Sequence, residues 1–261
     1  MKLAHGGNLA AAMARYGGTR EHWIDLSTGI APEGWPVPSL PAGVWQRLPE
    51  EGDQLRDIAA RYYRCQPQRL LPLPGSQHAI SLLPRLWPRG EVALPYWGYR
   101  EHQRAWAAAG HGCHYYRDLD ELAGLLADPM LRYAVLINPN NPTAELSEPA
   151  RLLPMLDVLA TRGGYLLVDE AFVDLYPDYS LGAHAHPALV VLRSVGKFFG
   201  LAGLRLGFAI AEPGVLAALD GATEPWALSH PARWVGAQAL ADESWQVRQR
   251  DTLSASAAHW Q

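Results

Sequence analysis

The sequence predicts an α/β fold, a three-layer sandwich in which helices cover both faces of a mostly parallel sheet. Short apolar runs rich in branched residues recur along the chain, and segments with helical spacing or strong helix formers separate most of them. Because the runs are apolar almost throughout, strands built from them should be buried on both faces. The runs are residues 91–94, 133–137, 165–168, 189–192 and 206–211.

Length and composition fit one large domain without a polyanion partner. The chain has 261 residues, 49% of them hydrophobic, and a formal net charge of −4. Its 22 basic and 26 acidic residues include no basic run, so neither nucleic acid nor an anionic membrane is an expected partner.

The cellular compartment is predicted from the cysteines and the apolar runs. Cys65 and Cys113 are too few for a disulfide framework, and the first residues contain no apolar signal-peptide core. No window approaches the roughly 18 consecutive apolar residues of a membrane helix. We therefore expect a cytoplasmic protein.

The two ends of the chain differ in pattern from its centre. Residues 17–49 are dense in Gly, Pro and Trp, which predicts an irregular arm within residues 1–50. Residues 51–230 contain the strand and helix pattern and are expected to form the large domain. Residues 232–261 read as one long helix without a Gly or Pro stop signal.

Polar residues follow the predicted strands. Trp97 follows the first run, Asn141 the second, Asp169 the third, and Ser194 and Lys197 the fourth. Ligands of parallel sheets bind beyond the carboxyl ends of the strands, so these side chains are expected to surround one site.

Lys197 is the most informative residue of this group. It lies between small and aromatic neighbours in residues 196–200, and Arg205 follows eight positions later. A surface lysine is the ordinary alternative, but this context is not a typical charged surface. A buried lysine with a lowered pKa can form an imine, which suits an aldehyde cofactor that carries a phosphate. The motif predicts the anchor for pyridoxal phosphate.

The other groups that this cofactor requires have candidates as well. Asp169 can pair with the pyridine nitrogen, and Asn141 can donate to the ring oxygen, although residues 138–142 could also be a plain turn. Trp97 can stack on the ring, although a tryptophan in a chain with ten of them is more often part of the core.

The cofactor phosphate has its own set of candidate ligands. Arg205 offers forked donors and Ser194 a hydroxyl. Gly75, Ser76 and Gln77 precede a predicted helix whose free amides would face an anion, although Gly-Ser before a helix is also an ordinary N-cap.

Two histidine-rich segments could be read as metal sites. One holds His184 and His186, the other His111, Cys113 and His114. Neither has the separated ligand pairs typical of zinc sites, so no metal is predicted.

These motifs together resemble the fold-type I pyridoxal-phosphate family, which includes aspartate and histidinol-phosphate aminotransferases. The resemblance extends from about residue 25 to residue 211. It implies that Lys197 bonds the cofactor, Asp169 pairs with the ring nitrogen and Asn141 binds the ring hydroxyl. The remaining cofactor contacts would come from Gly75, Ser76, Gln77, Ser194 and Arg205, and the enzyme would be a homodimer.

Within this family the chain looks most like the threonine-phosphate decarboxylases of cobalamin biosynthesis. Residues 5–8, 25–30 and 169–174 carry this likeness. It implies a phosphorylated amino acid as substrate, L-threonine O-3-phosphate, which is decarboxylated to aminopropanol phosphate. The implied substrate contacts are His5, Gly6, Gly7, Thr28 and Gly29. For His5 the alternative is a disordered amino terminus.

The chain also departs from the family pattern. Phe172, Leu48 and Gly196 stand where many relatives have tyrosine, tyrosine and serine. Relatives also continue into a small carboxyl-terminal domain with a carboxylate-binding arginine. Residues 231–261 would be the start of the helix leading to that domain, and the domain itself is expected to be absent from this chain.

Two other functions therefore stay open. One is an aminotransferase acting on a phosphorylated amino acid such as histidinol phosphate, because cofactor motifs do not select between decarboxylation and transamination. The other is a cofactor-binding protein without turnover.

Overall fold

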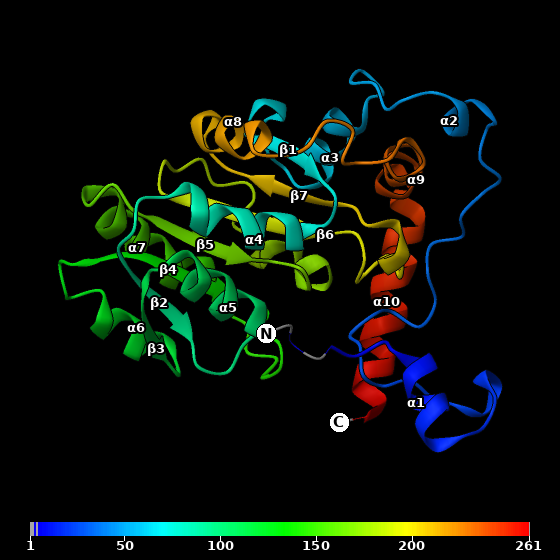
Figure 1. The fold of residues 1–261 in the computed structure, drawn as a ribbon, viewed down its shortest axis with the longest axis horizontal. Helices are drawn as coiled ribbons and strands as arrows, with labels where there is room; N and C mark the ends of the chain where they lie inside the picture. Colours follow the sequence, from blue (N-terminus) through cyan, green and yellow to red (C-terminus); the bar gives the residue numbers. More distant parts are fainter. Residues whose placement is uncertain (1–2, 4, 261) are drawn as a thin grey trace.

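The computed structural model describes residues 3 and 5–260. Its centre is a seven-stranded sheet of order β1-β7-β6-β5-β4-β2-β3 (Figure 1). β7 runs antiparallel to β1 and β6, and the pairs from β6 to β3 are parallel. The strands are β1 (Leu70–Leu73), β2 (Glu91–Pro95), β3 (Gly112–Tyr116), β4 (Leu131–Ile137), β5 (Tyr165–Asp169), β6 (Leu189–Ser194) and β7 (Gly207–Ile210).

Helices lie on both sides of this sheet, so the predicted fold class is confirmed. The α-helices are α1 (Leu9–Tyr16), α2 (Gly43–Gln46), α3 (Leu55–Tyr62), α4 (Ser76–Leu86), α5 (Arg100–Ala109), α6 (Leu119–Leu125), α7 (Pro149–Thr161), α8 (Pro213–Gly221), α9 (His230–Ala241) and α10 (Glu243–Trp260). Short 3-10 helices are η1 (Arg20–His22), η2 (Pro67–Arg69), η3 (Val173–Leu175), η4 (Pro177–Tyr179) and η5 (Ala202–Leu204).

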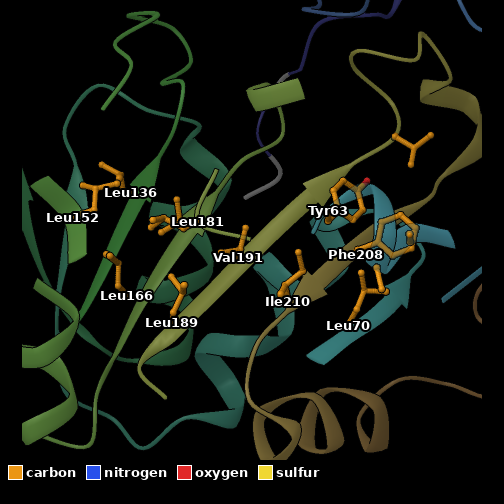
Figure 2. Packing of buried hydrophobic residues seen from close by; sticks show 14 of the residues in the cluster. Tyr63, Leu70, Leu136, Leu152, Leu166, Leu181, Leu189, Val191, Phe208 and Ile210 are labelled. Carbon is orange, nitrogen blue, oxygen red and sulfur yellow. The ribbon is translucent and has the colours of Figure 1, made fainter. Parts of the chain in front are cut away.

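The sheet has a separate apolar core on each face. Val168 and Val191 pack with helices α3, α6, α7 and α9, and Figure 2 shows part of this cluster. Leu167 and Leu192 pack instead with α4, α5 and α8. Because side chains alternate along a strand, Asp169 and Ser194 share the α4 and α5 face.

The five predicted strands correspond to β2, β4, β5, β6 and β7. Two further strands were not predicted from the sequence. β1 is only four residues long and contains Pro72, a residue that cannot donate to a ladder. β3 is an edge strand with the partly exposed polar residue His114 and exposed Tyr115, so it lacks the apolar character of the buried strands.

The single long helix expected over residues 232–261 is wrong, because the structure has two helices separated at Asp242. The Asp242 side chain accepts hydrogen bonds from the amide of Trp245 at 3.0 Å and the hydroxyl of Ser244 at 2.9 Å. These hydrogen bonds cap the start of α10, so a new helix begins after Asp242 and α9 does not continue through it.

The amino-terminal arm runs along the carboxyl-terminal side of the sheet, beside α10 (Figure 1). It is hydrogen-bonded to the loop after β6: the amide of Ala31 donates to the carbonyl of Lys197 at 3.1 Å, and Trp35 donates to Phe199 at 2.8 Å. No helix in the described part of the chain has the length and apolarity needed to cross a membrane.

Candidate active site

A pocket of about 140 Å³ lies at the carboxyl ends of β4, β5 and β6. It brings together eight of the predicted site residues, which come from four separate segments of the chain. The lining residues are Gly75, Ser76, Gln77, Ile80, Tyr99, Ile137, Asn141, Asp169, Ala171, Phe172, Ser194, Lys197 and Arg205.

Lys197 enters the pocket from the loop between β6 and β7. Its Nζ lies 5.2 Å from the centre of the Phe172 ring. Burial lowers the pKa of Lys197, and Arg205 adds to this effect while Asp169 opposes it. The amine is therefore easier to deprotonate than an exposed lysine, as imine formation requires.

Asp169 is fixed by bonds to both of its carboxylate oxygens. His102 Nε2, on helix α5, donates to Oδ2 at 2.9 Å, and the amide of Ala171 donates to Oδ1 at 3.1 Å. Both side chains are buried, and His102 Nδ1 has no hydrogen-bond partner among the described residues. These two hydrogen bonds fix the orientation of the carboxylate, which lines the pocket.

The loop after β4 contains three asparagines. One lines the pocket, and the side chains of the other two form hydrogen bonds that stabilise the loop. Asn138 exchanges two hydrogen bonds with the backbone of Ser147, at 2.8 and 3.0 Å. Asn140 donates to the carbonyl of Trp97 at 2.8 Å. Asn141 is the member of this group that lines the pocket.

The start of helix α4 provides an anion-binding end to the pocket. Gly75 has a φ of 83° and no side chain caps the helix, so the first amides are free to face a ligand. A Cβ on Gly75 would come within 2.8 Å of Arg205 Nη2, so glycine is needed for the close approach. Arg205 itself has a left-handed backbone with φ of 54°, a conformation that costs free energy for a non-glycine residue.

The structure does not bring Trp97 to the pocket. Trp97 is 57% exposed and packs edge-on against Tyr96. Tyr99, two residues later, lines the pocket instead and donates its hydroxyl to Gln77 Oε1 at 2.9 Å. Tyr99 could have been considered from the sequence, because it lies at the start of the helix that follows a predicted strand. The neighbouring Trp97 was preferred for its larger aromatic ring.

The five predicted substrate contacts lie together beside the pocket. The amide of Gly7 donates to Ser27 Oγ at 2.8 Å, and a Cβ on Gly7 would lie 3.1 Å from Thr28 Cγ2. The backbone of Gly6 also lies against Ser27, since a Cβ there would meet the Ser27 carbonyl oxygen at 2.0 Å. Gly29 is close to Phe172, which lines the pocket.

His5 completes this group. Its Nε2 donates to Glu101 Oε1 at 2.8 Å, and its ring centre is 6.1 Å from that of Tyr99. The arm therefore lies beside two residues of the pocket lining, Tyr99 and Phe172. Glu101 and His102, both on α5, are contacts that the sequence patterns did not suggest.

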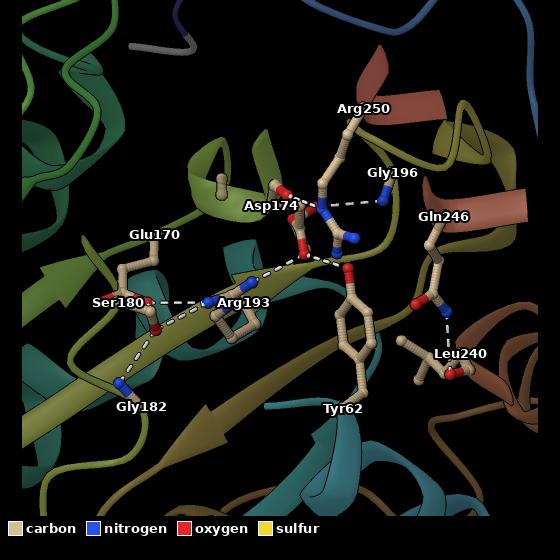
Figure 3. Close-up of polar contacts among 12 residues, drawn as sticks. Tyr62, Glu170, Asp174, Ser180, Gly182, Arg193, Gly196, Leu240, Gln246 and Arg250 are labelled. Atoms are coloured by element: carbon tan, nitrogen blue, oxygen red, sulfur yellow. Dashed lines mark hydrogen bonds and ion pairs between the residues drawn. The ribbon is translucent and has the colours of Figure 1, made fainter. Parts of the chain in front are cut away.

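On the opposite face of the sheet a polar network joins the residues next to Asp169 and Ser194 (Figure 3). Arg193 donates to Glu170 Oε2 at 2.9 Å and to Asp174 Oδ1 at 2.7 Å. Tyr62 donates to the same Asp174 oxygen at 2.8 Å. These buried charges pair with one another and brace the two strand ends.

The described residues contain no group of three or more His, Cys, Asp or Glu side chains arranged to hold a metal ion. His111 Nε2 donates to the carbonyl of Pro84 at 2.7 Å, and His114 pairs with Glu91 at 2.6 Å.

Residues 49–259 match the sequence profile of the family "Aminotransferase class I and II". The chain is 46% identical over 245 residues to a threonine-phosphate decarboxylase of Pseudomonas aeruginosa, covering 94% of this chain and 72% of that protein. It is 32% identical over 207 residues to a histidinol-phosphate aminotransferase of Baumannia cicadellinicola, covering 74% and 57%.

Among solved structures, the fold is similar to histidinol-phosphate aminotransferase from Sinorhizobium meliloti in complex with pyridoxal-5'-phosphate. The TM-score is 0.73 at 22% identity, and the match covers 82% of this chain and 62% of that one.

Proposed function

The chain belongs to the aminotransferase class I and II family, and from this premise we propose that it is a pyridoxal-phosphate enzyme that decarboxylates L-threonine O-3-phosphate. The observation that carries the proposal is the 46% identity to a threonine-phosphate decarboxylase over 94% of the chain. The chain spans 72% of that relative, so the activity of the whole protein is part of the proposal.

The donor set of the pocket fits the cofactor. The pocket has an amine of lowered pKa at Lys197, a buried carboxylate at Asp169 and an amide at Asn141. Its anion-binding end combines the uncapped start of α4 with Ser194 and Arg205, which suits a phosphate. The close approach of Gly75 to Arg205 leaves this end free of intruding side chains.

Each residue then has a role in holding the cofactor. Lys197 would supply the amine that bonds the aldehyde, and Asp169, oriented by His102, would pair with the ring nitrogen and retain its proton. Asn141 would donate to the ring oxygen, and Tyr99, which lines the pocket, would contact the ring in place of Trp97. Gly75, Ser76, Gln77, Ser194 and Arg205 would hold the phosphate.

When bound, pyridoxal phosphate supplies a conjugated ring that accepts electrons from the substrate Cα. In the proposed reaction the bond between Cα and the carboxylate carbon breaks, carbon dioxide leaves, and a proton bonds to Cα in its place. Lys197 would be the group placed to deliver that proton.

Substrate selection is proposed to depend on the arm. Thr28 and Gly29 offer backbone groups beside the pocket, and His5 with Gly6 and Gly7 lies at its mouth. A cationic or hydrogen-bonding side chain at this mouth suits the phosphate of the substrate. The product would be aminopropanol phosphate, and the proposal includes a role in cobalamin biosynthesis.

The second candidate is an aminotransferase that acts on a phosphorylated amino acid such as histidinol phosphate. It is favoured by the 32% identity to a histidinol-phosphate aminotransferase. Both reactions use the same cofactor contacts, because the choice depends on which bond to Cα is aligned with the ring.

One assay separates these candidates. Purified protein loaded with pyridoxal phosphate is given L-threonine O-3-phosphate, and carbon dioxide release is compared with 2-oxoglutarate-dependent amino transfer from histidinol phosphate. Carbon dioxide release without amino transfer supports the decarboxylase. Amino transfer without decarboxylation excludes it, and bound cofactor with neither reaction indicates a binding protein.

A further inference from the structure

The arm meets the helical layer of the domain at a hydrogen-bonded pair of side chains, His5 and Glu101. His5 Nε2 lies 2.8 Å from Glu101 Oε1. Glu101 is 3% exposed and lies on α5, two residues after Tyr99, which lines the pocket. The imidazole therefore lies at the edge of the pocket and is held there by a buried carboxylate.

Glu101 is shared between two donors. Its second oxygen, Oε2, accepts from Arg104 Nε at 2.7 Å and from Arg104 Nη2 at 2.6 Å. Burial raises the pKa of Glu101, but the hydrogen bonds from Arg104 and His5 outweigh this and lower it below its usual value. Glu101 is thus ionised, and Arg104 is the first of the two donors that stabilise its negative charge.

This arrangement fixes which part of the imidazole can meet a ligand. With Nε2 bound to Glu101, Nδ1 is the ring nitrogen left for another contact. In a doubly protonated ring both nitrogens donate, so Nδ1–H can bind an anion while Nε2–H stays on the carboxylate. A ring free to rotate would lose this orientation.

The neighbouring arm residues hold the backbone of this segment. Gly7 donates to Ser27 Oγ, and Gly6 lies so close to Ser27 that a side chain would not fit. Gly29 in turn touches Phe172 of the pocket lining. The backbone near His5 is therefore positioned by the arm itself, and the side chain is oriented by Glu101.

We propose that Glu101 is a positioning residue that orients the His5 imidazole so that its free ring nitrogen donates to the phosphate of the substrate. This inference rests on the proposed function, because it assigns the phosphate of a phosphorylated amino acid to the mouth of the pocket. Glu101 acts through His5 and does not itself touch the substrate.

The test compares Glu101→Gln with the wild type, using L-threonine O-3-phosphate and unphosphorylated L-threonine. Glutamine keeps the shape and one acceptor oxygen but not the charge. The expected result is a KM for the phosphorylated substrate raised about 10-fold, with kcat changed less than about twofold. Binding of L-threonine should be unchanged.

A double variant shows whether Glu101 acts through His5. If it does, Glu101→Gln adds nothing to the KM of His5→Gln, because the two residues form one unit. Full additivity would overturn the inference. An unchanged KM in Glu101→Gln would also overturn it. The same holds for a fall in kcat together with an equal loss of binding for both amino acids.

Two matched variants control for the loss of a carboxylate in general and for direct phosphate binding by Arg104. Glu91→Gln breaks a second Glu–His pair of similar length, Glu91–His114, on β2 and β3, and should leave KM unchanged. Arg104→Gln is made in the His5→Gln background, because Arg104 also bonds Glu101 and would otherwise act on KM through it. It should not raise KM further there, and a further rise would show that Arg104 binds the phosphate directly and would overturn the assignment of the phosphate to His5.

Binding is measured separately from turnover, by the change in cofactor absorbance when each amino acid is added. If the wild type binds L-threonine O-3-phosphate more tightly than L-threonine but releases no carbon dioxide, the proposed decarboxylase activity fails while the positioning role remains supported by the binding data of the variants. Equal binding of both amino acids by the wild type would overturn the inference.

Discussion

At Lys197, burial and Arg205 act against Asp169 in setting the charge of the amine. The direction of the net effect is a lowered pKa. A neutral amine is the nucleophile in imine formation, so the environment of the pocket, rather than any single contact, prepares this lysine for its proposed role.

The first prediction concerns the pH dependence of this reaction. With cofactor-free protein and pyridoxal, which lacks the phosphate, the rate of imine formation should rise with pH and level off below about 10.4, the ordinary lysine value. Asp169→Asn should move the profile to lower pH, because Asp169 stabilises the ammonium form. Arg205→Met should move it to higher pH. Stopped-flow absorbance measures all three profiles, and shifts of the same sign in both variants would contradict the assignment.

The second prediction uses the scarcity of lysine. The sequence has two lysines, Lys2 and Lys197. Reduction of the holoenzyme with borohydride, followed by peptide mass spectrometry, should place the pyridoxyl group on the peptide containing Lys197. Lys197→Ala should lose the imine absorbance and carbon dioxide release while keeping its circular dichroism, and Lys2→Ala is the matched control. A label on Lys2 would refute the central assignment.

The third prediction addresses the pair Asp169 and His102. Asp169→Asn removes the charge that retains the proton on the ring nitrogen, so kcat should fall about 10²–10³-fold. His102→Phe leaves the carboxylate in place but removes its 2.9 Å hydrogen bond, and a smaller loss of about 10–100-fold is expected. Steady-state kinetics test the order of the two effects. Wild-type kcat in Asp169→Asn would remove the proposed electronic role.

Most of the pocket residues could be predicted because they directly follow apolar strands. Asp169 and Ser194 are the last residues of β5 and β6, Asn141 follows β4, and parallel strands end at one edge of the sheet. Tyr99, His102 and Glu101 could not be predicted in this way. They act from the first turn of a helix, and which side of that helix faces the pocket depends on its packing against the sheet.

At the scale of elements, α10 holds both the arm and the loop that carries Lys197. Gln249 Nε2 donates to the carbonyl of Glu33 at 3.0 Å and to that of Phe198 at 3.3 Å. The arm adds its own bonds from Ala31 and Trp35 to the same loop. The loop is thus fixed from two sides by segments far from it in sequence.

The fourth prediction is that Gln249→Leu destabilises the protein and also disturbs the site. The buried carbonyl of Phe198 and the partly buried carbonyl of Glu33 lose their donor, which should cost about 1–3 kcal/mol in the free energy of unfolding. Gln246→Leu is a matched control, because Gln246 donates to the carbonyls of Ala239 and Leu240 between α9 and α10. Both variants should unfold at lower urea concentration, but Gln249→Leu alone should slow imine formation with pyridoxal. Equal rates in the two variants would argue against loop positioning by α10.

Helices and strands with a clear periodicity or an apolar run could be predicted from the sequence. Elements whose ends depend on local hydrogen bonds were missed. The break between α9 and α10 results from the Asp242 cap, which a helical pattern does not reveal. The hydrogen bond from the backbone amide of Trp245 also holds the pKa of Asp242 below its usual value, and a hydrogen bond from the Trp35 side chain contributes further. β1 and β3 form because strands β7 and β2 offer them free edges.

At the scale of the whole molecule, the arm exposes large apolar side chains to solvent. Ile24, Leu26, Trp45 and Leu48 are 84%, 88%, 68% and 60% exposed. We infer from these exposed side chains that parts of the arm are covered by a partner. A second copy of the chain is the partner implied by the family resemblance, and we propose a homodimer.

The fifth prediction tests that proposal through the mass in solution. Light scattering after size exclusion should give about twice the chain mass of 28.7 kDa. The double variant Trp45→Asp with Leu48→Asp should raise the dissociation constant more than about 100-fold, because an aromatic hot spot is worth about 2 kcal/mol and two-fold symmetry presents it twice. Met130→Asp is the matched control, since Met130 is 67% exposed just before β4, in a different part of the fold. A wild type that remains monomeric at high concentration, or equal effects of the arm and control substitutions, would show that the exposed arm is not the surface through which two copies associate.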